Sequence, residues 1–313
     1  MSLLEVKDLK VHYPIRGGFF NRVVDHVYAV DGVNMSIEQG KTYGLIGESG
    51  SGKTTIGKVI VGLEKATSGE VIYEGHNILD KKVRKEIKYN EDVQMIFQDS
   101  MSSLDPRKRV LDIIAEPIRN FEHLDPDAEK ARVRELLDIV GMPSDAIYKY
   151  PFEFSGGQRQ RIGVARAVAC KPKLVVCDEP TSALDLSVQA QVLNYLKEIQ
   201  KEFNLTYIFI SHDLGVVRHM SDYIYIMHRG RFTEAGTRED IYTDPQHIYT
   251  KRLIASIPQC NPGMKEDLRR TREAIDEMYE KQYRDYYDEE GRVYPLCQLT
   301  DTHFVAARKG GNE

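Results

Sequence analysis

The feature that most restricts the fold of this chain is the segment GESGSGKT at 47–54, which matches the pattern G-x-x-x-x-G-K-[ST]. A short apolar run at 42–46 predicts a strand before it, and residues 55–63 carry apolar side chains at helical spacing after it. A glycine-rich loop between a strand and a helix presents backbone N–H groups to phosphate oxygens, and the helix dipole favours the same anion. The segment therefore predicts a nucleotide site in an α/β fold.

The residues of this loop have separable roles. Gly47, Gly50 and Gly52 permit positive φ angles and allow the backbone to approach the phosphate oxygens closely. We expect Lys53 to contact the β and γ phosphates and the hydroxyl of Thr54 to hold Mg²⁺. The loop thus predicts a nucleotide that is bound together with a metal ion.

Two carboxylates follow the apolar run LVVC at 174–177. A carboxylate at the end of a buried strand can reach the metal ion of a nucleotide that is bound at the carboxyl edge of the sheet. We therefore expect Asp178 to bind Mg²⁺. Glu179 stands one residue further along, and we expect it to act as the general base on an attacking water.

The segment FSGGQRQR at 154–161 stands directly before a helical stretch. Ser155 is a residue of the type that caps helices, and Gly156 and Gly157 expose backbone N–H groups at the helix start. This is a second anion-binding end in a chain with one nucleotide motif. The combination predicts that each nucleotide is shared between two subunits.

The rest of the pattern indicates an α/β chain with a parallel sheet. Strands are expected at 4–13, 30–37, 174–177 and 207–210. Between the first two, residues 14–28 predict a loop or a hairpin. A helix is expected at 187–203, as the crossover between two parallel strands, and residues 107–149 predict several helices.

Charge and hydropathy exclude several classes of protein. The 313 residues include 43 Lys and Arg against 48 Asp and Glu, so the net charge is −5, which argues against a dedicated nucleic-acid binder. No stretch approaches the roughly 20 apolar residues that span a bilayer, and the first residues lack the apolar core of a signal peptide. The four cysteines show no paired metal-ligand spacing, which favours a reducing cytoplasm.

The motifs occur together in a pattern that resembles one family. GESGSGKT, Gln98 in MIFQDS, SGGQ, VCDEP, SALD and His212 in FISHD follow the order and approximate spacing of ABC-transporter ATPase subunits. The resemblance covers about residues 4–258. It implies an ABC ATPase domain of the P-loop NTPase fold, with a RecA-like core, an antiparallel β subdomain and a helical subdomain at about 100–165. A C-terminal extension at 259–313 would follow this domain.

The resemblance also implies roles for individual residues. In such proteins two subunits close head to tail around two ATP molecules. Gln98 would contact Mg²⁺ and the attacking water, His212 would orient water and phosphate beside Glu179, and Asp185 would link the two sites across the dimer. The residues implied to contact ATP are Gly47, Glu48, Ser49, Gly50, Ser51, Gly52, Lys53, Thr54 and Thr55 of one subunit and Ser155, Gly156, Gly157 and Gln158 of the other.

Two tyrosines are candidates for stacking on adenine. Tyr13 ends the first expected strand, where the family usually places an aromatic ring. Tyr28 is the rival, because it is closer to the phosphate loop in the sequence. The position in the family favours Tyr13.

Further segments resemble the ATPases of peptide importers, most closely the F-type ATPase of oligopeptide and dipeptide permeases. These segments lie at 102–117, 182–194 and 244–258. The resemblance implies a related D-type ATPase as partner, two membrane permease subunits, an indirect link to an extracytoplasmic substrate-binding protein, and a peripheral position on the cytoplasmic face of the membrane. The alternatives are an importer of nickel or another small solute, and a non-transport ABC ATPase.

The tail departs from the importer pattern. Many such ATPases carry clustered cysteines that hold an iron–sulfur centre, but Cys260 and Cys297 here are isolated, so we expect no such cluster. Within 265–292, apolar residues that include Met278, Tyr279 and Tyr283 recur at helical spacing. This predicts a solvated helix that packs on the main domain through its tyrosines.

Overall fold

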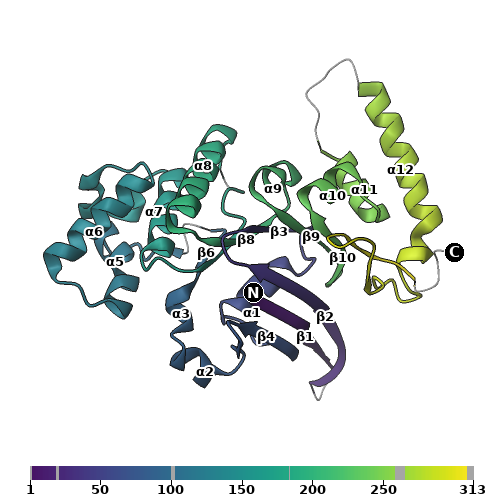
Figure 1. The fold of residues 1–313 in the computed structure, drawn as a ribbon, viewed down its shortest axis with the longest axis horizontal. Helices are drawn as coiled ribbons and strands as arrows, with labels where there is room; N and C mark the ends of the chain where they lie inside the picture. Colours follow the sequence, from purple (N-terminus) through teal and green to yellow (C-terminus); the bar gives the residue numbers. More distant parts are fainter. Residues whose placement is uncertain (1, 19–20, 100–102, 183, 258–264, 309–313) are drawn as a thin grey trace.

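The computed structural model describes residues 2–18, 21–99, 103–182, 184–257 and 265–308 (Figure 1). The strands are β1 (Ser2–Gly17), β2 (Arg22–Glu38), β3 (Thr42–Ile46), β4 (Ser68–Tyr73), β5 (His76–Asn77), β6 (Val93–Ile96), β7 (Leu174–Asp178), β8 (Thr206–Ser211), β9 (Tyr223–His228), β10 (Arg231–Thr237), β11 (Leu296–Gln298) and β12 (Phe304–Ala306). They form an eight-stranded sheet of order β11-β12-β10-β9-β3-β8-β7-β6 and a four-stranded sheet of order β2-β1-β4-β5.

Most of the helices cover these sheets or form a separate group at one end of the molecule. They are α1 (Lys53–Ile60), α2 (Lys81–Glu86), α3 (Tyr89–Asp92), α5 (Val110–Phe121), α6 (Pro126–Ile139), α7 (Gly156–Val168), α8 (Leu186–Phe203), α9 (Leu214–Met220), α10 (Arg238–Thr243), α11 (Ile248–Ala255) and α12 (Lys265–Tyr286), with 3₁₀ turns η1 (Ser144–Tyr148) and η2 (Pro151–Glu153). The group at one end consists of α5, α6 and α7 (Figure 1). None of the described helices is long and apolar enough to cross a bilayer.

The centre of the large sheet is parallel. β3 pairs in parallel with β8 on one side and with β9 on the other, and β8, β7 and β6 continue the parallel run. Every residue of β3, β7 and β8 is buried, as expected for strands that are covered on both faces. The strands predicted from continuous apolar runs are therefore confirmed, and their carboxyl ends meet at one edge of the sheet.

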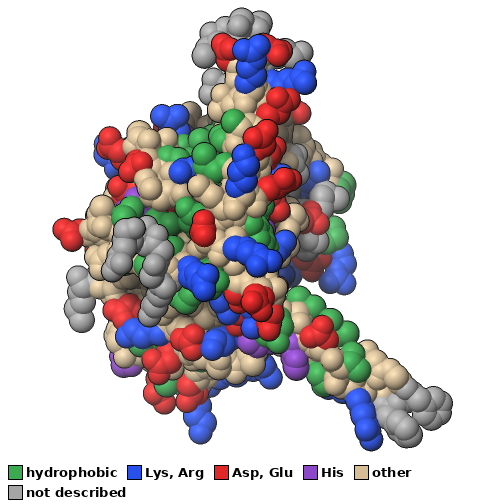
Figure 2. Space-filling model, turned by 90° about the vertical axis from the view of Figure 1, so that its right-hand side faces the viewer, with side chains coloured by type: hydrophobic (Ala, Val, Ile, Leu, Met, Phe, Trp, Pro, Cys, Tyr) green, Lys and Arg blue, Asp and Glu red, His purple; other side chains and the backbone are tan. Residues whose placement is uncertain are grey.

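The N-terminal segment forms a long hairpin. β1 and β2 remain antiparallel partners from Leu4 opposite Ile37 out to Gly17 opposite Arg22, so the segment predicted as a loop or hairpin is a hairpin. Its outer part projects from the molecule and carries exposed hydrophobic side chains (Figure 2). Val23 and Val24 are among them.

The helix after the phosphate loop is shorter than the sequence predicts. It begins at Lys53 and ends at Ile60, whereas the apolar spacing extends to Leu63. Gly62 has a φ of 79°, which is incompatible with a right-handed helix, and Leu63 is exposed.

The C-terminal part confirms one prediction and adds an unpredicted element. The expected helix is present as α12, and Tyr279 and Tyr283 are half-buried against the rest of the molecule, but Met278 is exposed, so its place in the buried stripe was wrong. Beyond α12, β11 and β12 form a hairpin that extends the large sheet next to β10. Cys297 in β11 is a free thiol, and Cys260 lies outside the described residues.

Candidate nucleotide site

The residues predicted to form the site follow four neighbouring strands of the large sheet. The phosphate loop follows β3, Gln98 follows β6, Glu179 follows β7 and His212 follows β8. Because these strands are parallel, their carboxyl ends bring the four segments to the same edge. The fold thus assembles these four motifs at one edge of the sheet.

The phosphate loop is packed so closely that its glycines are required. Gly52 has a φ of 109°, and a Cβ atom there would lie 2.0 Å from the carbonyl oxygen of Ala29. A Cβ on Gly47 would lie 2.1 Å from the carbonyl oxygen of Met227. Lys53 is buried and donates to the carbonyl oxygens of Gly47 and Glu48 at 2.7 and 2.8 Å. The loop is therefore folded around its own lysine, and burial lowers the pKa of that amine.

Two of the three side chains expected to hold the metal, Thr54 and Asp178, contact each other, whereas the third, Gln98, hydrogen-bonds to Glu179. Thr54 Oγ1 donates to Asp178 Oδ1 at 2.9 Å, and Asp178 is 4% exposed. Burial raises the pKa of the Asp178 carboxyl, and the Thr54 hydrogen bond opposes this. One carboxylate and one hydroxyl suit Mg²⁺, which usually takes few protein ligands and completes its shell with phosphate and water oxygens. Consistent with so small a donor set, the described residues contain no cluster of three His, Cys, Asp or Glu ligands.

Glu179 is held by both of its carboxylate oxygens. Gln98 Nε2 donates to Oε2 at 2.8 Å, and His212 Nδ1 lies 3.1 Å from Oε1. Glu179 has a φ of 45°, a left-handed conformation that residues other than glycine seldom adopt and that is common at functional sites. The structure thus brings together the three residues predicted to act on the attacking water.

The SGGQ segment stands apart from the phosphate loop. Ser155 Oγ accepts from the N–H of Gln158, and Gln158 Oε1 accepts from the N–H of Ser155, which closes a capping box at the start of α7. Ser155 and Gln158 are exposed, and Asp185 is the N-cap residue of α8. No hydrogen bond among the described residues joins Ser155 or Gln158 to the phosphate loop.

The two tyrosine candidates differ in their surroundings. The hydroxyl of Tyr13 lies near the side chains of Thr55, in α1, and Glu64, four residues beyond the end of that helix. Tyr28 contacts other rings and charges: the guanidinium of Arg292 lies 4.8 Å from its ring centroid. Tyr13 is therefore the ring that lies near the phosphate-loop helix.

Comparisons with known proteins now identify the family. Residues 30–182 match the family model described as ABC transporter. The chain is 59% identical, over 99% of its length, to the oligopeptide transport ATP-binding protein OppF of Lactococcus lactis subsp. lactis, of which it covers 97%. This chain belongs to the ABC transporter family. It is an ABC-type ATPase subunit.

Other members of the family agree with this assignment. The oligopeptide transport ATP-binding protein AppF of Bacillus subtilis is 46% identical over 82% of this chain, with 78% of AppF covered. The solved structure of the ATP-binding cassette MJ0796 bound to ADP and Pi superposes with a TM-score of 0.67 at 26% identity, covering 75% of this chain and 98% of that one. The predicted ABC ATPase fold is confirmed.

One contact at the phosphate loop of this ABC ATPase has no counterpart in the sequence analysis. The backbone N–H of Glu48 donates to the hydroxyl of Tyr249, in α11, at 3.2 Å. The two residues are 201 positions apart, and Tyr249 lies in the importer-like segment 244–258 without a predicted role there. Periodicity places Tyr249 on a helix face, but only the tertiary fold brings it to the loop.

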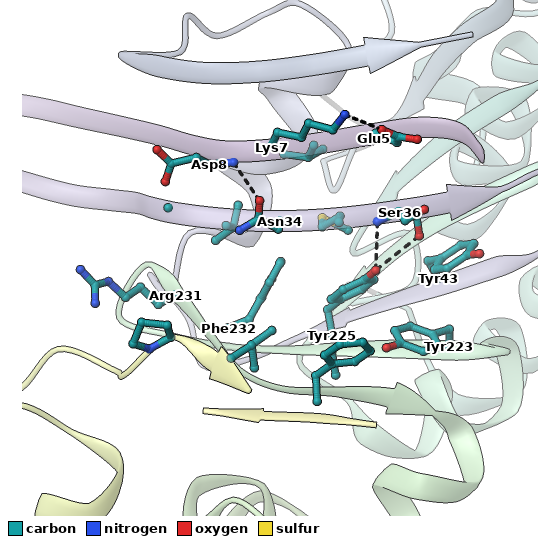
Figure 3. Close-up of a pocket in the computed structure, with 18 of the residues that line it drawn as sticks. Glu5, Lys7, Asp8, Asn34, Ser36, Tyr43, Tyr223, Tyr225, Arg231 and Phe232 are labelled. Atoms are coloured by element: carbon teal, nitrogen blue, oxygen red, sulfur yellow. Dashed lines mark hydrogen bonds and ion pairs between the residues drawn. The ribbon is translucent and has the colours of Figure 1, made fainter. Parts of the chain in front are cut away.

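A cavity of about 1040 Å³ lies between β2 and the strands β9 and β10, and it is not part of the nucleotide site (Figure 3). Tyr223, Tyr225 and Phe232 line it. The hydroxyl of Tyr225 is paired with the backbone of Ser36 on the opposite wall. The Tyr225 hydroxyl therefore links the two sheets across the cavity.

Proposed function

We propose that this chain is the ATP-hydrolysing subunit that powers import of oligopeptides or dipeptides through separate membrane permease subunits. The observation that carries the proposal is the position of Glu179 between Gln98 and His212, beside the phosphate loop. The similarity to proteins named for oligopeptide and dipeptide transport supports the cargo.

ATP would be bound through the phosphate loop. Backbone N–H groups at 47–55, other than that of Glu48, which donates to Tyr249, would contact the phosphates together with Lys53, which would exchange its carbonyl partners for phosphate oxygens. Tyr13 would stack on adenine, since its ring is exposed near the helix that follows the phosphate loop. Thr54, Asp178 and Gln98 would hold Mg²⁺. When bound, Mg²⁺ supplies charge that offsets the negative phosphate oxygens.

Glu179 is the proposed base for hydrolysis. Its carboxylate would accept a proton from water as the water oxygen bonds to the γ-phosphorus and the bond to the ADP oxygen breaks. Gln98 and His212 fix the direction of the carboxylate, which positions the water for in-line attack. His212 would also contact the γ-phosphate.

A second ATPase subunit completes the site. Ser155, Gly156, Gly157 and Gln158 of the partner would contact the γ-phosphate, and Asp185 would link the two sites. This fits the exposure of Ser155 and Gln158 and their separation from the phosphate loop of their own chain. The dimeric structures of the cassette MJ0796 support a paired arrangement, and a related D-type ATPase is the proposed partner.

Residues 4–258 form the proposed ATPase domain, with its helical subdomain at about 100–165, and 259–313 form its extension. Two permease subunits would dock beside Gln98 and the helical subdomain, which places the chain on the cytoplasmic face of the membrane. The extracytoplasmic binding protein would act through them.

The test is ATP-dependent uptake by the complete transporter in membrane vesicles. Glu179→Gln is expected to lower ATP hydrolysis and peptide uptake by a factor of about 10²–10⁴, the usual contribution of a general base. Glu198→Gln, an equivalent change on an exposed face of α8, should leave both unchanged. Uptake of nickel in place of peptide would overturn the cargo, and normal hydrolysis by Glu179→Gln would overturn the base.

A further inference from the structure

Three aromatic side chains link the C-terminal segment to the phosphate loop. Tyr249 receives the hydrogen bond from the backbone N–H of Glu48. The ring of His228 stacks on Tyr249 with centroids 4.2 Å apart and planes 17° apart. Tyr287, at the end of α12, places its hydroxyl 2.9 Å from His228 Nδ1. We call His228, Tyr249 and Tyr287 the aromatic clamp, and each of the three side chains is buried.

The turn between β9 and β10 forms a second contact between the same two regions. The N–H of Gly230 in this turn donates to the carbonyl oxygen of Ser51, within the phosphate loop, at 3.0 Å. On its other side the turn is held by the C-terminal segment, because Arg229 donates to the hydroxyl of Tyr283 at 2.8 Å and to the carbonyl oxygen of Gly291 at 3.0 Å. The turn therefore lies between the loop and the extension.

We propose that the aromatic clamp holds the phosphate loop in its ATP-binding shape, so that Tyr249, His228 and Tyr287 are positioning residues for nucleotide. To bind phosphate, the backbone N–H groups of the loop must point toward one anion. Gly47 and Glu48 are the loop residues farthest in sequence from α1, the helix that holds the other end of the loop. The clamp holds the N–H of Glu48, the second residue of the loop, on the hydroxyl of the buried Tyr249. The C-terminal extension covers this ring through Tyr287 and His228. The extension is thus part of the support of the nucleotide site.

The expected effect follows from preorganisation. Without its partner, the N–H of Glu48 no longer favours one loop shape, and the apparent dissociation constant rises as the binding-competent fraction falls. A neutral hydrogen bond contributes about 0.5–1.5 kcal/mol net, which corresponds to about a 2- to 12-fold loss of affinity. The turnover number should change little, because Glu179, Gln98 and His212 are untouched.

The experiment compares tyrosine-to-phenylalanine variants of the full chain. Tyr249→Phe is expected to raise the dissociation constant for ATP about 2- to 12-fold, and the KM in the assembled transporter by a similar factor, with kcat within twofold. Tyr287→Phe should weaken affinity less, because its ring still packs against His228. Tyr223→Phe is the matched control: its hydroxyl also bonds the C-terminal segment, at Thr302, but away from the loop, so affinity should not change.

A second measurement separates positioning from simple folding. By linkage, if the extension favours the ATP-binding loop, bound ATP must protect the amides of 265–308 from hydrogen exchange, and this protection should be lost in Tyr249→Phe. Unchanged affinity in both clamp variants, or exchange in the extension that ATP does not alter, would overturn the inference. The inference rests on the nucleotide role proposed above. That role fails separately if the parent chain does not bind ATP.

Discussion

At the scale of single residues, the orientation of Glu179 depends on one neutral donor. Gln98 Nε2 lies 2.8 Å from the carboxylate, so a second carboxylate at this position would face it directly. Like charges at such a distance raise a carboxyl pKa by about one unit or more. We expect Gln98→Glu to lower kcat by about tenfold or more, because the new carboxylate removes the donor and also repels the carboxylate of Glu179.

The matched change is Gln98→Ala, which removes the donor without adding charge. It should lower kcat less than Gln98→Glu does. The measurement is kcat for ATP hydrolysis by the assembled transporter. A kcat in Gln98→Glu equal to that of the parent would mean that Gln98 does not orient Glu179.

The predictability of the site also differs between residues. Lys53, Asp178, Glu179 and His212 could be found from sequence because each follows a strand and belongs to a short pattern that chemistry restricts. Tyr249 could not be found, because its contact joins positions 201 residues apart through packing of α11 on the loop. Sequence patterns report local backbone requirements, and they do not report which distant side chain supports them.

At the scale of elements, the C-terminal hairpin is fixed by one buried ion pair. His303 Nε2, just before β12, lies 2.7 Å from Glu234 Oε1 in β10, and both side chains are buried. Glu234 also accepts from the N–H groups of Gln246 and His247, where α11 begins. The same carboxylate therefore joins the sheet, the hairpin and α11.

Removing the histidine should leave a buried carboxylate without its counter-charge. We expect His303→Ala to lower the free energy of unfolding by about 3 kcal/mol, measured by urea denaturation. His76→Ala, at an exposed position in β5, is the control and should have little effect. If the two variants were equally stable, the ion pair would not anchor the hairpin.

The same hairpin shows why some elements escape sequence analysis. The strands β3, β7 and β8 were predicted because each is a continuous apolar run with both faces buried. β11 and β12 have three residues each and no clear alternation, and they are stabilised by an edge strand far away in sequence. A segment this short takes its structure from its partner.

At the scale of the whole molecule, two buried histidines make the free energy of unfolding depend on pH. Burial lowers the pKa of His228 to about 4 and that of His247 to about 3. Below about pH 6.5 the unfolded chain protonates these groups and the folded chain does not, so stability falls as pH decreases from about 6.5 to about 4. Each histidine contributes a slope of about 1.4 kcal/mol per pH unit in this window.

His303 acts in the opposite sense. Glu234 raises its pKa, so its contribution is complete below about pH 6.5 and is lost as pH rises through its folded pKa. The test is urea denaturation at several pH values. His247→Asn keeps an acceptor for the N–H of Tyr249 but does not titrate, so the slope below pH 6.5 should fall by about half. An unchanged slope would assign the acid sensitivity to other groups.

The phosphate loop and the SGGQ segment lie apart in one chain, so the complete ATP site proposed above requires a second subunit. Ser155 is the solvent-exposed N-cap residue of α7. A substitution there can therefore alter the surface that contacts a partner subunit without altering the phosphate loop of the same chain. Ser155→Asp keeps a capping oxygen but places a negative charge where the γ-phosphate of the partner's ATP would lie.

The ATP affinity of the separated Ser155→Asp subunit should stay within twofold of that of the parent. ATP-driven pairing with the D-type partner ATPase, followed by analytical ultracentrifugation with Glu179→Gln also present in this chain to prevent hydrolysis, should be lost. Ser155→Asn, a neutral cap, should pair normally. If Ser155→Asp instead weakened ATP binding by the separated subunit, the SGGQ segment would serve the site of its own chain, and the shared-site arrangement would be wrong.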